Sequence, residues 1–330
     1  MIRKSGRQHV PLWFVLAMVT EIGVVVKDIC ALCLEEKDLQ LSHIVPKFVF
    51  SYVKRSAPSA LRSYRTPNLR IQDGEKEYLL CKECEQLFSG WEKLFSELLF
   101  TPLHNPFPVT IPIIYRDWAL KFAVSVSWRV LQHYAKKGLH HFSDEQKDQA
   151  NQALNTWRRF LIGDKKNPAS FEQHLLPLDV IEQHSGGNVS PFLNRYLLRA
   201  IHTDVLATQT SALVYTKLCR VLIVGFIHED NSSGWKGTKM HVNRGVISPR
   251  DYLVPAAIFD YINDKASQTK KALDSLSPNQ DQKVAKFIKE NLDGIGDSEI
   301  FRAMSYDVHH SGKAAFKPSK EKDQAHEAES

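Results

Sequence analysis

Apolar positions in the larger, second part of the chain recur mostly at helical spacing. The strongly apolar stretch from Asp117 to Ala135 predicts a buried helix, and Ser143-Asp-Glu-Gln146 has the form of a capping box that opens another helix. Further helices are expected from about Ser190 to Ile201, from Tyr252 to Leu273, and after Ser277-Pro278 as far as Gly294. Helix therefore dominates this part of the chain.

Two short runs in the same part follow a different pattern. Ala212–Thr216 and Arg220–Ile227 are short and rich in β-branched residues, which predicts neighbouring strands. Cys219, which stands alone before the second run, is interpreted as a small buried hydrophobe. The expected class is α+β, in which a small N-terminal module precedes a larger, mainly helical domain with a short β-hairpin or sheet.

An apolar stripe follows a C-x-x-C pair near residue 84 and predicts one more helix. Its members recur at three- and four-residue steps and are expected to belong to the core. They are Leu87, Phe88, Trp91, Leu94, Phe95, Leu98 and Leu99.

The chain is predicted to divide into four segments. They are a doubtful extension (1–26), a cysteine module (27–104), the mainly helical domain of unknown role (105–310) and a disordered tail (311–330), whose composition is too polar to bury a core.

The first 26 residues resemble a secretory signal only in part. Three basic residues precede the apolar run Pro11–Val19, but Glu21 interrupts it early and no convincing cleavage site follows. The run is also far too short to span a membrane. Translation from Met18 is an alternative explanation. We expect no export and no membrane association, and a cytoplasmic location.

Composition adds one local feature to this picture. The 330 residues are 43% hydrophobic and 24% charged, with a formal net charge of +6, which is ordinary for a globular protein. The segment Lys47–Arg70, however, holds six basic residues and no Asp or Glu. These residues are Lys47, Lys54, Arg55, Arg62, Arg65 and Arg70. Such a segment is either a solvated loop or a site of phosphate contact, and the absence of acidic residues favours phosphate contact.

Four of the five cysteines form two C-x-x-C pairs, Cys30/Cys33 and Cys81/Cys84. Each pair supplies half of a tetrahedral thiolate shell, and the odd total argues for metal binding in a reducing compartment rather than for disulfides. We predict one structural Zn²⁺ with no open coordination position. A zinc knuckle, a hairpin and a second knuckle that opens a helix describe a treble-clef arrangement.

Leu41-Ser42-His43-Ile44-Val45-Pro46 lies between the pairs, and at this point the sequence resembles the HNH family of metal-dependent endonucleases. The resemblance is to the four-cysteine, zinc-stabilised members, which have a ββα-metal fold, and it covers roughly residues 28–95. His43 stands ten residues after Cys33, as in that family. Ser42 replaces the family's acidic metal ligand, Glu85 replaces the residue after the second knuckle, and the family's middle Asn has no clear equivalent.

The resemblance implies a hydrolase that cleaves phosphodiester bonds in DNA. His43 would be the general base, Glu85 would help to hold a catalytic Mg²⁺ or Mn²⁺, and the basic segment would bind the flanking phosphates. Aromatic residues within that segment would stack on unpaired bases. They are Phe48, Phe50, Tyr52 and Tyr64. RNA is an alternative substrate.

Two other interpretations remain open. His43 is equally well interpreted as a capping histidine, in which case the chain is a non-catalytic, zinc-stabilised module that binds nucleic acid or protein. Alternatively, residues 105–310 carry their own activity, although no nucleophile elbow, phosphate loop or HExxH motif occurs there. Substrate, oligomeric state and the role of the larger domain are not specified by the sequence.

Overall fold

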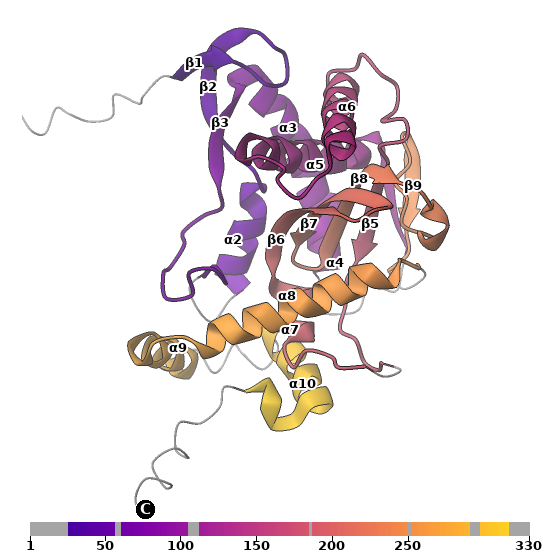
Figure 1. Cartoon of the computed structure of the whole chain (residues 1–330). Coiled ribbons are helices and arrows are strands. Elements are labelled where there is room, and N and C mark those ends of the chain that lie inside the picture. The colour runs from indigo at the N-terminus through magenta and orange to yellow at the C-terminus, as the bar shows by residue number, and fades with distance from the viewer. Residues whose placement is uncertain are drawn as a thin grey trace, which may run out of the picture.

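The computed structural model describes residues 26–56, 61–104, 112–184, 187–249, 252–290 and 298–316. Three antiparallel sheets and the helices packed around them form an α+β fold, and the buried side chains of the N-terminal module and of the following part join in one cluster. Figure 1 shows the first sheet at one end of the molecule and the four-stranded sheet near its centre. The prediction of an α+β class is confirmed.

The N-terminal sheet has the order β1-β2-β3, and both strand pairs are antiparallel. A register shift between Gln40 and Leu41 interrupts the β2–β3 pairing. The helix α2 occupies part of the long connection between β2 and β3, where the sequence suggested a basic loop, and α3 follows β3 directly. Their bounds are β1 Val26–Ile29, β2 Glu36–His43, α2 Lys47–Ser56, β3 Lys76–Cys81 and α3 Lys82–Phe95.

The apolar stripe of α3 is only partly in the core, which corrects the prediction. Phe88, Phe95 and Leu99 are fully buried, whereas Leu87 and Leu98 are 41% and 50% exposed. The helix continues through a π-helical turn and the short α4, so the stripe spans more than one face of the packed helix. These elements are the π-helix η1 Ser96–Phe100 and α4 Thr101–Leu103.

The helix α5, Asp117–Lys137, lies between the N-terminal sheet and the four-stranded sheet. Fourteen of its residues are buried, because it packs against α3, α6 and all four strands of the larger sheet. Phe122 stacks on Phe95 of α3, with ring centroids 3.8 Å apart. The prediction of a buried helix at this position is confirmed, as is the capping box of Ser143 and Gln146 that opens α6, Asp144–Leu161.

The four-stranded sheet has the order β5-β8-β7-β6 and is covered on both faces. Along β8, Ile223 belongs to the cluster shared with α5 and α6, whereas Leu222 and Val224 belong to the cluster shared with α7 and α8. A strand buried on both faces needs no polar alternation, which explains the continuous apolar run. The strands are β5 Gln173–Pro177, β6 Ile201–Ala207, β7 Ser211–Leu218 and β8 Val221–Glu229.

The two predicted strands are thus the central pair of a larger sheet. Cys219, at the turn between them, is fully buried as expected, and burial raises the pKa of its thiol to about 12. A separate antiparallel pair joins β4 and β9. The remaining elements are β4 Ile113–Arg116, α7 Leu193–Arg199, η2 Ser232–Gly234, β9 Arg244–Ile247, α8 Ala256–Asp274, α9 Pro278–Glu290, α10 Glu299–Ser311 and η4 Gly312–Ala315.

The predicted tail begins too early, because residues 311–316 are ordered. Ala315 is buried, and its carbonyl oxygen accepts a hydrogen bond of 2.6 Å from Arg195 Nη2. The doubtful extension before residue 26, residues 105–111, the helix end at Gly294 and the tail after residue 316 lie outside the described residues. The division into segments at residues 104 and 105 stays a prediction.

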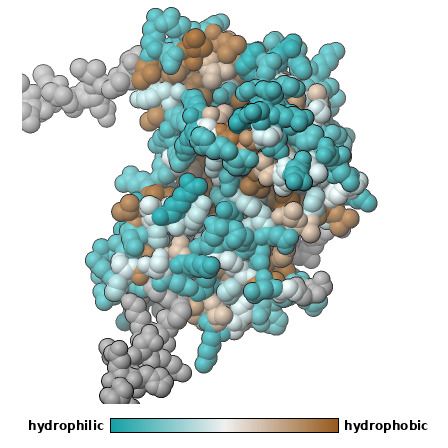
Figure 2. Space-filling view, in the orientation of Figure 1, coloured by the Kyte–Doolittle hydropathy of each residue, from teal (hydrophilic) through white to brown (hydrophobic). Residues whose placement is uncertain are grey.

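Within the described ranges, no helix combines the length and the apolar character that crossing a lipid bilayer requires. The space-filling view is predominantly hydrophilic, with apolar residues gathered at its top over the end of the β1–β2 hairpin (Figure 2). Ile29 and Leu34 of this end are 59% and 55% exposed.

Candidate metal centre

The four paired cysteines converge at the end of the N-terminal sheet. The sulfur atoms of Cys30, Cys33, Cys81 and Cys84 all lie within 4.8 Å of one another, and Cys33 Sγ is 3.9 Å from Cys81 Sγ. A tetrahedral Zn²⁺ with bonds of about 2.3 Å to sulfur separates its ligands by about 3.8 Å, so the spacing fits such an ion. The four cysteines are positioned to bind one metal ion, as predicted.

The turn after β1 presents the first pair. Leu34 N donates to Cys30 O at 2.9 Å, and Leu34 itself adopts φ of 64°, in the left-handed region that a leucine rarely occupies. Ala31 N donates to Leu79 O at 3.0 Å, which fixes the turn to β3. The strained backbone at this turn is therefore held by the sheet on which the metal centre sits.

The second pair spans the junction between β3 and α3. Cys81 ends the strand, and Cys84 lies in the first turn of the helix. Cys81 N donates to Cys30 Sγ at 3.3 Å, so the backbone of one pair contacts the sulfur of the other. Two segments that are separated by 47 intervening residues are thus joined at this centre.

The thiols differ in their acidity. Burial alone would raise the pKa of Cys30, but backbone contacts with Cys33 and Cys81 outweigh burial and hold this pKa below its usual value. Burial raises the pKa of Cys81 to about 11, and burial together with the neighbouring sulfurs raises the pKa of Cys84 further. Four thiolates this close repel one another unless a cation lies between them, which is the charge that a bound metal supplies.

His43, the candidate general base, ends β2 with its side chain 19% exposed. Its Nε2 atom lies 2.9 Å from Asp73 Oδ2, and Lys76 Nζ lies 3.0 Å from the same oxygen. Burial alone would raise the pKa of Asp73, but the contacts with His43 and Lys76 outweigh burial and lower it. The imidazole is therefore oriented by an ionised carboxylate.

Sequence reasoning missed Asp73. It stands in a turn before β3, and an acidic residue followed by Gly74 gives a signal for a turn but none for a histidine partner 30 positions away. Gly74 is required for packing here, because a Cβ atom on it would lie 2.4 Å from Phe50 Cζ of α2. The turn that carries Asp73 is thus fitted against α2.

The other two positions of the HNH-like pattern behave differently from each other. Ser42 is 1% exposed, and its hydroxyl donates to Gln40 O at 3.3 Å, so it is not placed to bind a cation. Glu85, one residue after Cys84, has a buried Oε1 atom with no hydrogen-bond partner among the described residues. Within the same residues, no hydrogen bond or ion pair joins His43 to Glu85.

A buried arginine connects the hairpin to α3 instead. Arg129 of α5 has a side chain that is only 2% exposed; its Nη1 atom donates to His43 O at 3.0 Å, and its Nη2 atom lies 2.8 Å from Glu92 Oε1. His133, one turn further along α5, contacts the carboxylates of Glu75 and Glu77 through its two ring nitrogens. Side chains of α5 thus cover this face of the hairpin.

The basic segment is exposed on α2 and on the loop that follows it. Lys47, Lys54, Arg55, Arg65 and Arg70 are exposed. Arg62 is half-buried instead, because its guanidinium donates to Pro67 O and to Gln280 Oε1, both at 2.8 Å. Arg62 therefore ties the loop to α9 and is poorly placed for phosphate contact.

The expectation that aromatic residues of this segment stack on bases is wrong for the three on α2. Phe50 is 6% exposed, Phe48 lies 5.1 Å from the ring of Phe100, and Tyr52 donates to Glu299 Oε2 at 2.9 Å. Helical spacing turns these side chains toward the core while the lysines face solvent. Tyr64 packs against the ring of His202 at 5.8 Å.

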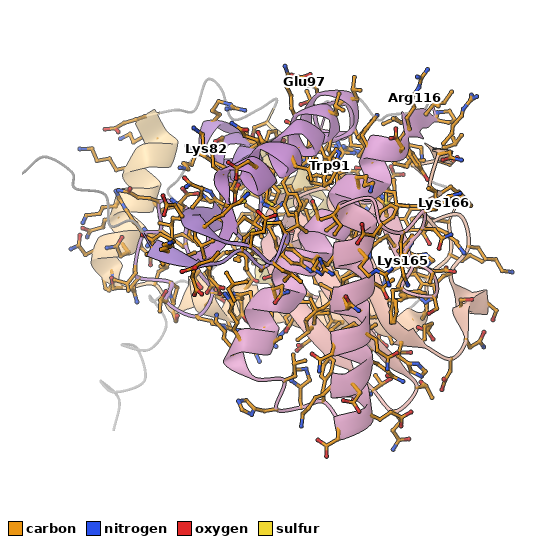
Figure 3. All side chains as sticks on the ribbon, turned by 90° about the horizontal axis from the view of Figure 1, so that it is seen from above. Lys82, Trp91, Glu97, Arg116, Lys165 and Lys166 are labelled. Atoms are coloured by element: carbon orange, nitrogen blue, oxygen red, sulfur yellow. The ribbon has the colours of Figure 1, made fainter. Side chains whose placement is uncertain are left out.

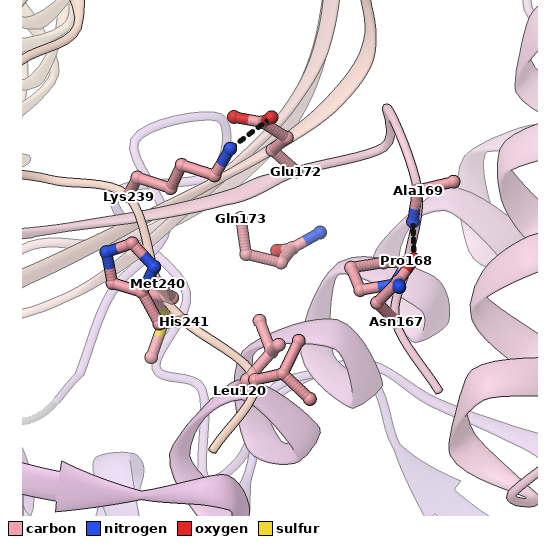
Figure 4. A pocket seen from close by; sticks show the side chains of 10 residues that line it. Leu120, Asn167, Pro168, Ala169, Glu172, Gln173, Lys239, Met240 and His241 are labelled. Atoms are coloured by element: carbon pink, nitrogen blue, oxygen red, sulfur yellow. Dashed lines mark hydrogen bonds and ion pairs between the residues drawn. The ribbon is translucent and has the colours of Figure 1, made fainter. Parts of the chain in front are cut away.

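A cavity of about 210 Å³ lies far along the chain from the cysteines, between α5, β5 and residues 239–242. Figure 4 shows the Gln173 amide in the middle of it and the ion pair of Glu172 with Lys239 at one side. Gln173 Oε1 accepts a hydrogen bond of 2.7 Å from Ser127, which directs Nε2 into the cavity. The cavity shares no residue with the HNH-like pattern.

Comparison of the chain with protein-family models, with curated proteins and with solved structures finds no match.

Proposed function

We propose that this chain is a zinc-stabilised nucleic-acid-binding protein whose N-terminal module contacts the phosphate backbone through α2 and the loop after it. In this proposal the four cysteines hold one structural Zn²⁺ in a treble-clef arrangement of knuckle, hairpin and helix. Zinc would fix the β1–β2 turn to the start of α3. A reducing cytoplasm would keep the thiols free for the metal.

The observation that carries the proposal is a contrast between two groups of basic side chains on the module and on the neighbouring helix α5. Lys37, Lys76, Lys136 and Lys137 each lie within 3.3 Å of a carboxylate oxygen. In the described part of the chain, no carboxylate pairs with a second group of exposed cations. That group is Lys47, Lys54, Arg55 and Arg70. Three of them are on α2 and Arg70 is on the loop after it. Unpaired cations gathered in this way attract a polyanion and release its counterions on binding.

Lys47 and Lys54 are seven residues apart on α2, so they lie on one side of the helix at a separation of about 10 Å along its axis. At about 3.4 Å of helix axis per phosphate on one strand, this separation corresponds to phosphates about three positions apart. Direct base recognition is not part of the proposal, since Phe50 is in the core and Phe48 and Tyr52 pack against it. Binding is expected to be dominated by electrostatics, with DNA as the first candidate and RNA as the second.

The test is fluorescence anisotropy with a labelled 20-base-pair DNA duplex across a series of salt concentrations. The double variant Lys54→Gln/Arg55→Gln should weaken binding and reduce the slope of log K against log salt by about 2, since each lost phosphate contact removes about 0.9. Lys147→Gln, which changes an exposed lysine already paired with Asp144 at 2.9 Å, is the matched control. Equal affinities and slopes for all three proteins would refute the proposal.

Hydrolysis is a second candidate function, and the His43–Asp73 pair specifically favours it. A carboxylate that fixes the ring and stabilises the imidazolium is a common way to orient a general base. The unpartnered Oε1 atom of Glu85 would coordinate a divalent cation such as Mg²⁺ or Mn²⁺, and this cation would stabilise negative charge on a phosphate. Against it stands Ser42, whose buried hydroxyl replaces a carboxylate.

Plasmid nicking in Mg²⁺ or Mn²⁺ tests this second candidate. Wild type should convert supercoiled plasmid to the open form, His43→Ala should abolish nicking, and Asp73→Asn should reduce it while leaving the affinity for DNA unchanged. Equal nicking by wild type and His43→Ala, or none by either, removes the nuclease and leaves the binding proposal standing.

A further inference from the structure

One face of α3 and of the π-helical turn after it is apolar and exposed, and no described element covers it. Leu87, Leu94 and Leu98 are 41%, 37% and 50% exposed, and Trp91 is partly exposed between them. The steps of four, three and four residues place all four side chains on one stripe of the helix. Apolar side chains gathered in this way mark an interaction surface more often than scattered ones do.

The same stripe contains a glycine in mid-helix. Gly90 lies one turn after Leu87, is exposed, and has no atom within 4 Å of the position that a Cβ would take. Glycine inside a helix is unfavourable relative to alanine, and nothing inside this chain needs the missing side chain. A small residue at this point allows a second helix to approach α3 closely, so the shape of the stripe suits a helix.

Several unpaired cations lie around the stripe, next to the acidic residues of α3 itself. Figure 3 looks onto this face and shows Trp91 among Lys82, Arg116, Lys165 and Lys166. None of these four cations is paired with a carboxylate in the described part of the chain. Of the acidic residues on the same helical segment, Glu83 is paired with Lys37 and Glu92 with Arg129, whereas Glu97 lies beside the stripe.

Contacts from α5 connect the stripe to these cations. Lys121 Nζ lies 5.7 Å from the centre of the Trp91 ring and 4.0 Å from that of Phe160, near the end of α6. The end of α6 is therefore close to Trp91, and the loop that carries Lys165 and Lys166 begins there. The strand β4 contacts the π-helical turn, which brings Arg116 to the end of the stripe near Leu98.

We propose that this face, defined by Leu87, Gly90, Trp91, Leu94 and Leu98, docks an amphipathic helix with acidic flanks from a partner protein. Leucine side chains of the partner would pack between these residues, and its Glu or Asp side chains would meet the basic rim. A second copy of this chain fits less well, because its own rim has the same sign of charge. Nucleic acid fits the rim but offers no apolar helix face for three leucines.

The test uses two fluorescently labelled synthetic peptides of four heptads, each with leucine at the a and d positions. One has Glu at the e and g positions and the other has Lys there. Anisotropy with the full, metal-loaded chain should show the acidic peptide binding at least tenfold more tightly than the basic one. Leu94→Glu should weaken binding of the acidic peptide at least tenfold.

Gly90→Leu separates docking from folding. A leucine in this open position fits the chain itself and should raise the melting temperature by about 2 °C, because it replaces a helix-breaking residue. The same substitution should weaken binding of the acidic peptide at least tenfold, because the leucine side chain would occupy the space in which the partner helix approaches Gly90. Leu69→Glu, which changes another leucine that is 63% exposed, is the matched control and should leave the affinity unchanged.

Three results would overturn the inference. Equal affinity for the two peptides would show that the charge of the partner helix does not determine binding. Unchanged affinity for the acidic peptide in both Leu94→Glu and Gly90→Leu would show that the peptide does not bind at the stripe. Self-association in sedimentation experiments that Leu94→Glu abolishes would make a second copy the occupant. A comparable loss of duplex-DNA affinity in Leu94→Glu would assign the face to nucleic acid instead.

Discussion

The ion pair between Arg129 and Glu92 provides a quantitative test of how the N-terminal module is fixed to the rest of the protein. Arg129→Met keeps the length of the side chain and its packing on the ring of Phe88, which lies 5.3 Å from the guanidinium carbon. It removes the donor to His43 O at 3.0 Å and the cation 2.8 Å from Glu92 Oε1. The expected loss of stability therefore arises from the polar contacts.

Its magnitude follows from the burial of the two partners. Breaking a fully buried pair costs about 3–5 kcal/mol, mainly because the remaining charge is left without a partner. The side chain of Glu92 is 21% exposed, so part of its charge is solvated, and the lower part of that range applies. Loss of the hydrogen bond to the His43 carbonyl adds about 1 kcal/mol. Arg129→Met should thus destabilise the protein by about 3–4 kcal/mol.

Urea unfolding of the metal-loaded protein, followed by tryptophan fluorescence, measures this cost. Glu92→Gln should cost about 1–2 kcal/mol, because a polar amide oxygen stays beside the Arg129 guanidinium although the charge attraction is lost. The double variant should cost less than the sum of the two, with a coupling free energy of about 1–3 kcal/mol. A cost below about 1 kcal/mol for Arg129→Met, or additive single changes, would refute the view that α5 holds the hairpin and α3 together.

Two further predictions concern the buried core. Burial lowers the pKa of His104 and of His174 to about 3 and that of His202 to about 4, whereas each takes up a proton near pH 6.5 in the unfolded chain. Because the unfolded chain binds more protons than the folded protein between these pH values, the melting temperature should fall as the pH is lowered from 6.5 to 4. A melting temperature that stays constant over this range would contradict the prediction. Gly245→Ala should cost about 1–3 kcal/mol in the same urea assay, because a Cβ would lie 2.0 Å from the Tyr115 hydroxyl oxygen, and an unchanged midpoint would contradict the packing.

Local patterns in the sequence predicted several elements correctly. The helix from Asp117, the capping box at Ser143 and the strands around Cys219 each depend on neighbouring residues, and the structure has all three. The two C-x-x-C pairs were also sufficient to identify the cysteine cluster, because metal ligation requires those residue types at that spacing. For these features, the information lies within a few residues of the feature itself.

Features that depend on distant packing could not be predicted. Whether an apolar residue of α3 is buried depends on where α5 packs against the helix. Phe88 and Leu87 both belong to the predicted apolar stripe, but Phe88 is fully buried and Leu87 is 41% exposed. The partner of His43 is 30 residues away in a turn, and Arg129 comes from a helix 86 residues away. The error on the aromatic residues of α2 has the same cause, because the segment was expected to contact phosphates and bases and no helix was predicted there.

The central claim of this account is that one metal ion joins the two cysteine pairs. X-ray absorption at the zinc edge of the purified, zinc-supplemented protein tests it most directly. We expect one zinc per chain with four sulfur neighbours at about 2.3 Å. A protein that retains no zinc after dialysis, or a zinc ion with nitrogen or oxygen in place of two or more sulfurs, would contradict the claim.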